Sequence, residues 1–346
     1  MNSITQFLYN ILAGINGVVG NYGVAIIIFT ILMRMICMPF DYRSRKGMRK
    51  MSLIQPKLNE LQRKYGNDKQ KFQQKQAELM RKEGYNPLSS CLPMLLTWPL
   101  MIAMFAAMRA IANEQLAMQV FKYLAGEEQI ISAADRFLWV KNIWMTDSPF
   151  TPIAPNATAL QMLTQDVWQK AYDLVQQDPN LLAAVTKNIS AEFLDFSTSD
   201  AMKKSVEQII SVLETLPNYS AAVDGVPGWK NMNFLLFSVT LYQNYNGLLI
   251  FPVLAGVSQL LQTKFNPQMS EQQPQPNGKP NSMSNFMKYF FPILSVFFCL
   301  TSNAGFAVYW VTSSCVMWAQ SIIITKILEK KDQKKAATVS GEGSVK

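Results

Sequence analysis

Histidine is absent from the 346 residues, which excludes histidine-based catalytic triads, histidine metal sites and imidazole proton relays. The four cysteines stand singly in apolar stretches without a CxxC spacing. We therefore expect them to be small buried side chains rather than disulfides or metal ligands. The sequence has no GxxxxGK[ST] or GxGxxG loop that could cradle a phosphate. It thus predicts no enzyme and no resident metal or cofactor.

Acidic residues are also absent from five apolar runs, near 22–40, 91–111, 247–264, 286–302 and 305–327. A helix that crosses a bilayer needs roughly 20 predominantly apolar residues. We therefore predict an all-α polytopic membrane protein with five spans.

Arg34 lies inside the first run. Its guanidinium stays protonated, and a charge at that depth costs on the order of 2.5–3.5 kcal/mol on insertion scales. Asp41 is the nearest acid, but seven residues place it roughly 10 Å away along a helix. We therefore expect water in a hydrated cavity to accompany Arg34. Polar residues that could line this cavity are Thr97, Ser258, Gln259, Gln262, Thr263, Thr312, Ser313, Ser314 and Gln320.

Lysine and arginine counts beside the runs predict the orientation. Residues 43–86 hold 13 Lys and Arg against 4 acids, residues 113–232 hold 8 against 14, and the tail from Lys326 holds 6 against 3. The first and last of these segments are therefore expected in the cytoplasm and 113–232 outside, with the N-terminus outside and the C-terminus inside. Three explanations for the charge of 43–86 stay open: topology alone, anchoring to anionic lipid, and contact with ribosomal RNA.

The chain is thus expected to consist of ten segments. They are an interfacial amphipathic helix at 1–21, a first span at 22–42, a cytoplasmic helical hairpin at 43–86, a second span at 87–112, an external segment at 113–246, a third span at 247–265, a cytoplasmic loop at 266–285, a fourth span at 286–302, a fifth span at 305–328 and a basic cytoplasmic tail at 329–346. An extended first span is the alternative for 1–21. Pro56 should kink the first arm of the hairpin or mark its boundary. The external segment should be helical near 157–177 and 199–215.

Several motifs, in this order, resemble those of the YidC family of membrane protein insertases. They are Gln55-Pro56-Lys57 with Lys64-Tyr65, Asn86-Pro87-Leu88, Cys91-Leu92-Pro93, Trp98-Pro99, Leu254 to Lys264, and Ala304 to Ser313. The resemblance covers about 20–150 and 232–328. Residues of about 150–230 look like an insertion, which could be a partner surface or inert.

The resemblance implies five spans around a hydrophilic groove that is closed to the outside and open to the cytoplasm and the lipid. Arg34 stands where the family has its groove arginine, and Gln262 corresponds to a groove glutamine. The substrate-binding groove is therefore expected to comprise Arg34, Thr97, Ser258, Gln259, Gln262, Trp310 and Ser313. Two alternatives stay open: Gln262 could join helices by a hydrogen bond, and Trp310 could anchor at the membrane interface.

The function implied by this resemblance is that of a membrane protein insertase and chaperone in the bacterial plasma (inner) membrane. It would accept nascent membrane proteins, alone or with the Sec translocon, and release their apolar segments into lipid. The ribosome is a further implied partner, through the basic tail, and no sequence-specific nucleic-acid binding is expected. The competing hypotheses are a small anion channel or transporter that uses Arg34, and a structural assembly factor beside the translocon.

Overall fold

The computed structural model describes residues 3–85, 87–127, 130–234, 237–265 and 282–342. These residues are mostly helical, as predicted, and include a small antiparallel sheet of β1 (Met232–Phe234) and β2 (Phe237–Val239). The chain forms two compact units. The first unit consists of Met1–Phe29, Ala103–Leu254 and Val296–Trp310, and the second of Thr30–Ile102, Ala255–Ser295 and Val311–Lys346.

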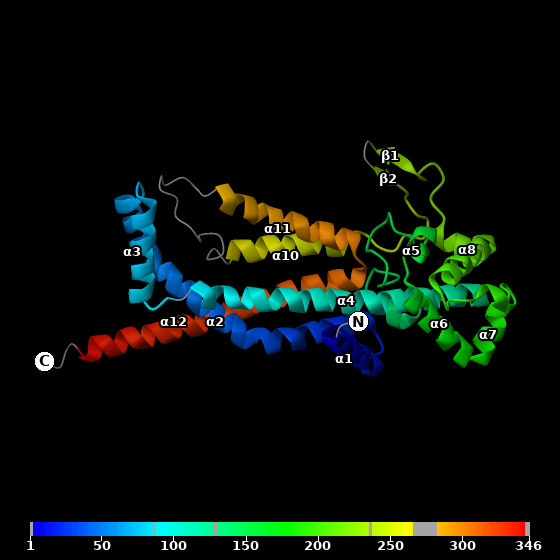
Figure 1. The fold of residues 1–346 in the computed structure, drawn as a ribbon, viewed down its shortest axis with the longest axis horizontal. Coiled ribbons are helices and arrows are strands. Elements are labelled where there is room, and N and C mark those ends of the chain that lie inside the picture. Colours follow the sequence, from blue (N-terminus) through cyan, green and yellow to red (C-terminus); the bar gives the residue numbers. More distant parts are fainter. Residues whose placement is uncertain (1–2, 86, 128–129, 235–236, 266–281, 343–346) are drawn as a thin grey trace. The chain divides into compact units, whose positions relative to one another are not determined.

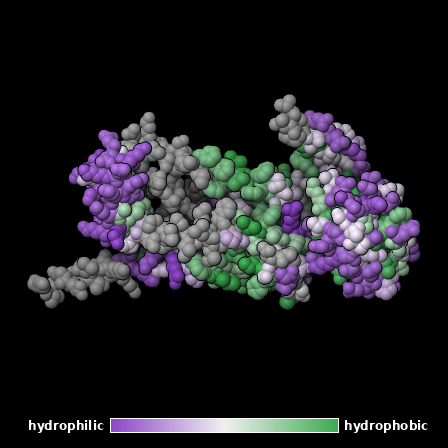
Figure 2. Space-filling model, in the orientation of Figure 1, coloured by the Kyte–Doolittle hydropathy of each residue, from purple (hydrophilic) through white to green (hydrophobic). Residues whose placement is uncertain are grey.

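Five helices carry the apolar runs: α2 (Tyr22–Tyr65), α4 (Pro87–Ala125), α10 (Ile250–Phe265), α11 (Ser282–Thr301) and α12 (Ala304–Glu342). Among the described residues, α2 and the Ala304–Gln333 part of α12 are long and apolar enough to cross a membrane. Ile250–Gln262 and Lys288–Thr301 are shorter apolar helices. Figure 2 shows hydrophobic surface over α10 and α11, and large side chains such as Ile293 and Phe297 are exposed there. Lipid is a suitable surrounding for such a surface.

Helix α1 (Ser3–Val19) is amphipathic in the first unit. Leu8 and Leu12 are buried, whereas Ile4 and Phe7 are exposed on another face. Gln6 and Asn10 are exposed as well, and Gln6 donates to Asn10 (3.0 Å), so the exposed part of the helix combines apolar and uncharged polar side chains.

The segment that the sequence predicts to be external contributes a helical subdomain to the first unit. Its helices are α5 (Ala157–Gln161), α6 (Gln165–Gln177), α7 (Pro179–Thr186), α8 (Ser199–Thr215) and α9 (Pro217–Val223), with 3-10 turns at Ala133–Asp135 and Ala191–Phe193. Figure 1 shows α5 to α8 gathered around the end of α4. The core is aromatic: Trp168 stacks on Phe196 with ring centroids 5.7 Å apart, and Phe121 packs edge-on against both. Helix α8 confirms the stretch predicted at 199–215.

A buried network of hydrogen bonds joins this subdomain to the start of α12 within the first unit. The Asn246 amide accepts from the Asn142 N–H (2.7 Å) and donates to the carbonyls of Asn142 (2.8 Å) and Thr146 (3.0 Å). The carbonyls of Ile143 and Met145 then accept the Gly305 and Ala304 N–H groups. These bonds pair backbone groups that have no access to water.

Two expectations need correction: Pro56 as a boundary of the hairpin arm, and burial of all the cysteines. The kink at Pro56, the alternative to a boundary, stays a prediction. Helix α2 does not end at Pro56 but continues through Pro39 and Pro56 to Tyr65. Cys37 and Cys299 are buried as expected, whereas Cys315 is exposed. An apolar stretch of sequence has the same composition whether its side chains face protein or lipid, which is why the cysteine prediction failed. The Cys91 side chain lies outside the described residues.

Candidate functional site

Arg34 lies in the second unit, on a part of α2 that is otherwise apolar. Its neighbours Met35 and Ile36 are 56% and 65% exposed, whereas Thr30, one turn earlier, is fully buried. Arg34 itself is half-buried. Arg34 therefore lies at the boundary between the buried and the exposed face of α2.

The guanidinium is held by α12. Its Nε donates to the Ser313 hydroxyl at 2.8 Å, and Nη2 donates to the same oxygen. Gln320 Nε2 donates to the Arg34 backbone carbonyl at 3.0 Å. Because Ser313 and Gln320 are seven residues apart, they lie two turns apart on one face of α12. The Arg34 side chain thus extends from the level of Gln320 toward that of Ser313.

The partner of the charge is neutral. Within the described part of the chain, Arg34 forms no ion pair, and Asp41 is not within salt-bridge distance. The sequence predicted a polar surrounding without a counter-ion, and Ser313 supplies part of it. A single hydroxyl leaves most of the five guanidinium donors for other acceptors.

Gln262 lies close to the same stretch of α12. Its Nε2 donates to the Ser314 carbonyl at 3.0 Å, so it joins α10 to α12. Ser313 and Ser314 are both buried. This bond is of the interhelical kind that the sequence left open as the alternative role of Gln262.

The other predicted residues are less directly connected to Arg34. Ser258 donates to the Ala255 carbonyl of its own helix (2.9 Å), and Gln259 is half-buried. Trp310, in the first unit, packs against Phe306, and its buried indole N–H has no acceptor among the described residues. The Thr97 side chain lies outside those residues.

Comparison with known proteins identifies the family. The model of the 60Kd inner membrane protein family matches residues 14–200 and 207–332, which is most of the chain. The chain belongs to this family.

Proteins named membrane protein insertase YidC are similar to this member of the 60Kd inner membrane protein family. The Fusobacterium nucleatum protein is 36% identical over 140 residues, covering 40% of this chain and 60% of that protein. The Clostridium tetani protein is 33% identical over 150 residues, 42% of this chain and 60% of that one. The Aromatoleum aromaticum protein is 46% identical over 98 residues, 28% and 18% of the two chains. The chain therefore spans about three fifths or less of these relatives.

Further contacts join α2 and α12 of this family member, and the sequence did not predict them. Arg45 donates to the Ser321 hydroxyl (2.7 Å), Arg49 pairs with Asp332 (3.0 Å), and Lys331 Nζ donates to the Tyr42 hydroxyl (2.9 Å). The partners are more than 270 positions apart in the chain, and no spacing in the sequence could have paired them. These contacts continue the attachment of α12 to α2 beyond Arg34.

Within the described residues, no group of three or more acidic, cysteine or histidine side chains could hold a metal ion. What the Arg34 site offers is a fixed cation with a neutral partner, in a helix that is otherwise apolar. Such a site can attract a polar or acidic group without acid–base or nucleophilic chemistry.

Proposed function

We propose that this chain is a membrane protein insertase and chaperone. The observation that carries the proposal is the guanidinium of Arg34, which lies in an apolar helix and is held by the Ser313 hydroxyl rather than by a carboxylate. A buried acid would neutralise the charge, whereas a hydroxyl orients it and leaves it able to attract an anion.

The proposed site is a hydrophilic groove among five membrane spans, α2, α4, α10, α11 and α12, open to the cytoplasm and the lipid. Arg34, Gln262 and Ser313 form its polar centre. The bond from Arg34 to Ser313 and the bond from Gln262 to the neighbouring Ser314 carbonyl of α12 support this choice. The wider groove would add the other predicted residues, which are Thr97, Ser258, Gln259 and Trp310.

The proposed client is a nascent membrane protein. Its polar or acidic outer segment would enter the groove, where a carboxylate could take the free edge of the guanidinium in a bidentate pair. Its apolar segment would leave into lipid, which releases about 25 cal/mol per Å² of apolar surface removed from water. In this mechanism Arg34 lowers the cost of bringing polar groups to bilayer depth, and lipid supplies the driving force.

The proposed location is the bacterial plasma (inner) membrane, with the N-terminus outside and the C-terminus in the cytoplasm. The basic excess of 43–86 and of the tail supports this orientation. The exposed Ile4 and Phe7 of α1, beside the uncharged polar Gln6 and Asn10, suit a helix that lies along the outer interface. The Sec translocon and the ribosome are proposed as partners on the strength of the resemblance alone.

Client insertion in cells depleted of their own insertase tests the proposal. We expect Arg34→Ala and Arg34→Glu to lose insertion of a single-span client with an acidic outer segment, and Arg34→Lys to retain part of it. The same substitutions at Arg109 are the matched control, because Arg109 is an exposed arginine on the apolar helix α4. Normal insertion by Arg34→Glu would refute the proposal. Anion flux in liposomes that disappears in Arg34→Ala would favour the channel instead.

A further inference from the structure

The hairpin formed by the end of α2 and α3 (Lys69–Lys82) encloses an open cavity of about 410 Å³ within the second unit. The turn of the chain joins the two helices at one end of the cavity, and side-chain contacts join them at the other. At the turn, Asp68 caps α3 by accepting the Lys71 N–H (3.0 Å). At the base, Lys57 pairs with Glu83 (2.6 Å) and Lys50 donates to the Gly84 carbonyl (2.8 Å). The arms are thus held at a spacing that leaves the middle unfilled.

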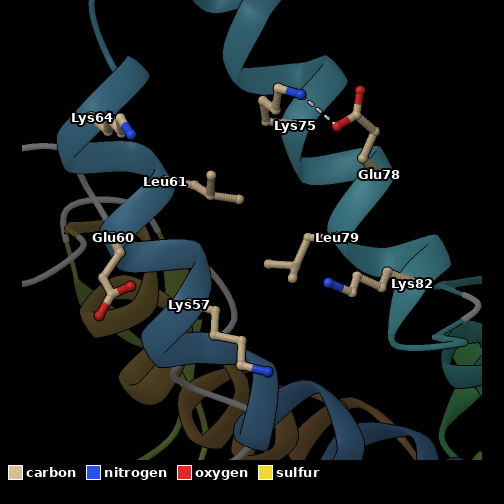
Figure 3. A pocket seen from close by; sticks show the side chains of 8 residues that line it. All are labelled: Lys57, Glu60, Leu61, Lys64, Lys75, Glu78, Leu79 and Lys82. Carbon is tan, nitrogen blue, oxygen red and sulfur yellow. Dashed lines mark hydrogen bonds and ion pairs between the residues drawn. The ribbon is translucent and has the colours of Figure 1, made fainter.

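The walls combine an apolar centre with four lysines and two glutamates, Glu60 and Glu78, so the lining carries a net positive charge. Figure 3 shows Leu61 of α2 and Leu79 of α3 pointing toward one another across the gap. Lys57 and Lys82 lie at one end of this leucine pair, and Lys64 and Lys75 at the other. Both leucines are only partly covered by the rest of the hairpin.

Two of the four lysines already have carboxylate partners. Lys57 pairs with Glu83, and Lys75 pairs with Glu78 (2.7 Å), whose hydrogen bond raises the pKa of Lys75. Lys64 and Lys82 form no ion pair within the part of the chain that the structure describes. They lie at opposite ends of the cavity. These two positive charges are therefore separated, with the leucines between them, and the Glu60 carboxylate on the wall formed by α2 has no ion-pair partner among the described residues either.

This division indicates the class of occupant. Lys57 and Lys64 on α2, like Lys75 and Lys82 on α3, are seven residues apart, about 10.5 Å along a helix. The two ends of the cavity, at which Lys64 and Lys82 lie, are therefore separated by about this distance along the helices, with the leucines between them. An α-helix with acidic side chains at i and i+7 and an apolar side chain between them has the complementary pattern. A phosphate backbone or a layer of lipid headgroups would match the lysines but would leave the leucine pair without a partner.

We propose that the cavity between α2 and α3 is a docking site for an acidic amphipathic helix of a partner protein. The apolar side chain of that helix lies between Leu61 and Leu79, and its two carboxylates pair with Lys64 and Lys82. This proposal does not depend on Arg34 or on the insertase function.

The test is fluorescence anisotropy of a labelled helical peptide against the full chain in nanodiscs of zwitterionic lipid. The peptide carries Glu at i and i+7 with Leu between them. One comparison peptide has Gln for both Glu residues, and another has Ser for Leu. We expect each change to weaken binding about tenfold, since burial of a leucine and loss of two charge pairs each reach that size.

Variants of the chain locate the binding. Lys64→Gln with Lys82→Gln should weaken binding of the Glu peptide about tenfold. The matched control is Lys69→Gln with Lys71→Gln, which removes the same charge from exposed positions of α3 outside the cavity and should leave binding within about twofold. Circular dichroism of both variants verifies that the hairpin stays helical.

Three outcomes would overturn the proposal. One is absence of peptide binding, and another is equal weakening by the two lysine pairs. The third is equal binding of the Leu and Ser peptides together with displacement by RNA or by phosphatidylglycerol vesicles. That last result would assign the hairpin to polyanions in general.

Discussion

Replacing Ser313 by alanine tests how the Arg34 charge is positioned. The substitution keeps the Cβ atom and removes the hydroxyl that accepts from both Nε and Nη2 of Arg34. Ser313 is only 3% exposed, so solvent cannot readily take its place. We expect the guanidinium to lose its orientation while α2 and α12 stay attached through Gln320.

Two magnitudes could describe the free energy of the hydrogen bond that Ser313→Ala removes. Hydrogen bonds between neutral groups of membrane helices average about 0.6 kcal/mol. Hydrogen bonds to charged groups contribute about 1.5–3 kcal/mol. The second range applies because arginine cannot lose its proton and Ser313 is buried. A loss of about 1.5 kcal/mol reduces the population of the oriented side chain about tenfold.

The assay is insertion of two matched single-span clients, one with an acidic and one with a neutral outer segment. We expect Ser313→Ala to slow the acidic client about tenfold and the neutral client less. Ser313→Thr keeps a hydroxyl and should restore insertion. Ser314→Ala is the matched control, because Ser314 is equally buried and the Gln262 bond uses only its carbonyl.

A double-mutant cycle decides whether the hydroxyl acts through Arg34. In an Arg34→Met background, Ser313→Ala should have no further effect on insertion or on melting of the purified protein. An equal loss in both backgrounds would refute the reasoning. So would a Ser313→Ala protein that inserts the acidic client as fast as Ser314→Ala does.

Two further predictions concern the first unit. Asn246→Ala should lower the free energy of unfolding by on the order of 3 kcal/mol or more, because three hydrogen bonds are lost from a fully buried side chain. Thermal melting in detergent measures this, and Asn244→Ala, which removes one exposed bond to Ala221, should cost less than about 1 kcal/mol. Burial raises the pKa of Tyr123 to about 12, above about 10 for an unfolded tyrosine. The contribution of Tyr123 to the free energy of unfolding should therefore be constant below a pH of about 10 and should fall above it until the phenol of the folded protein ionises. Phenolate absorbance, compared with that of Tyr123→Phe, measures the pKa of Tyr123. A pKa of about 10 in the folded protein would contradict the prediction.

The helices could largely be predicted from composition, because apolar runs of span length and helical spacing identify helices without any knowledge of their partners. Helix α8 matches its predicted range, and the helical stretch predicted at 157–177 divides into α5 and α6 around residues 162–164. The absence of a helix boundary at Pro56 has a local cause. A proline removes one hydrogen bond, but the turns on both sides of it can continue the helix, so proline alone does not define a helix end.

The sequence could predict what kind of groups surround Arg34, but not which residue binds its guanidinium. Its depth in an apolar run and the lack of nearby acids predicted water in a hydrated cavity lined by polar residues, with Ser313 as one of several candidates, rather than one side-chain partner. The identity of that partner could not follow, because Ser313 lies 279 positions away and other serines, Ser314 and Ser321, stand on the same helix. Only tertiary packing selects among them.

Once Ser313 is known as the partner, however, helical periodicity orders the rest of α12. Seven residues on, Gln320 binds the Arg34 carbonyl, and the next steps of four reach Ile324 and Leu328, which are both buried. Four further on, Asp332 pairs with Arg49. The covered face of α12 thus changes from polar to apolar to charged along its length. A shift of α12 by one residue would remove all of these partners together, so the register of α12 on α2 fixes the position of the cation.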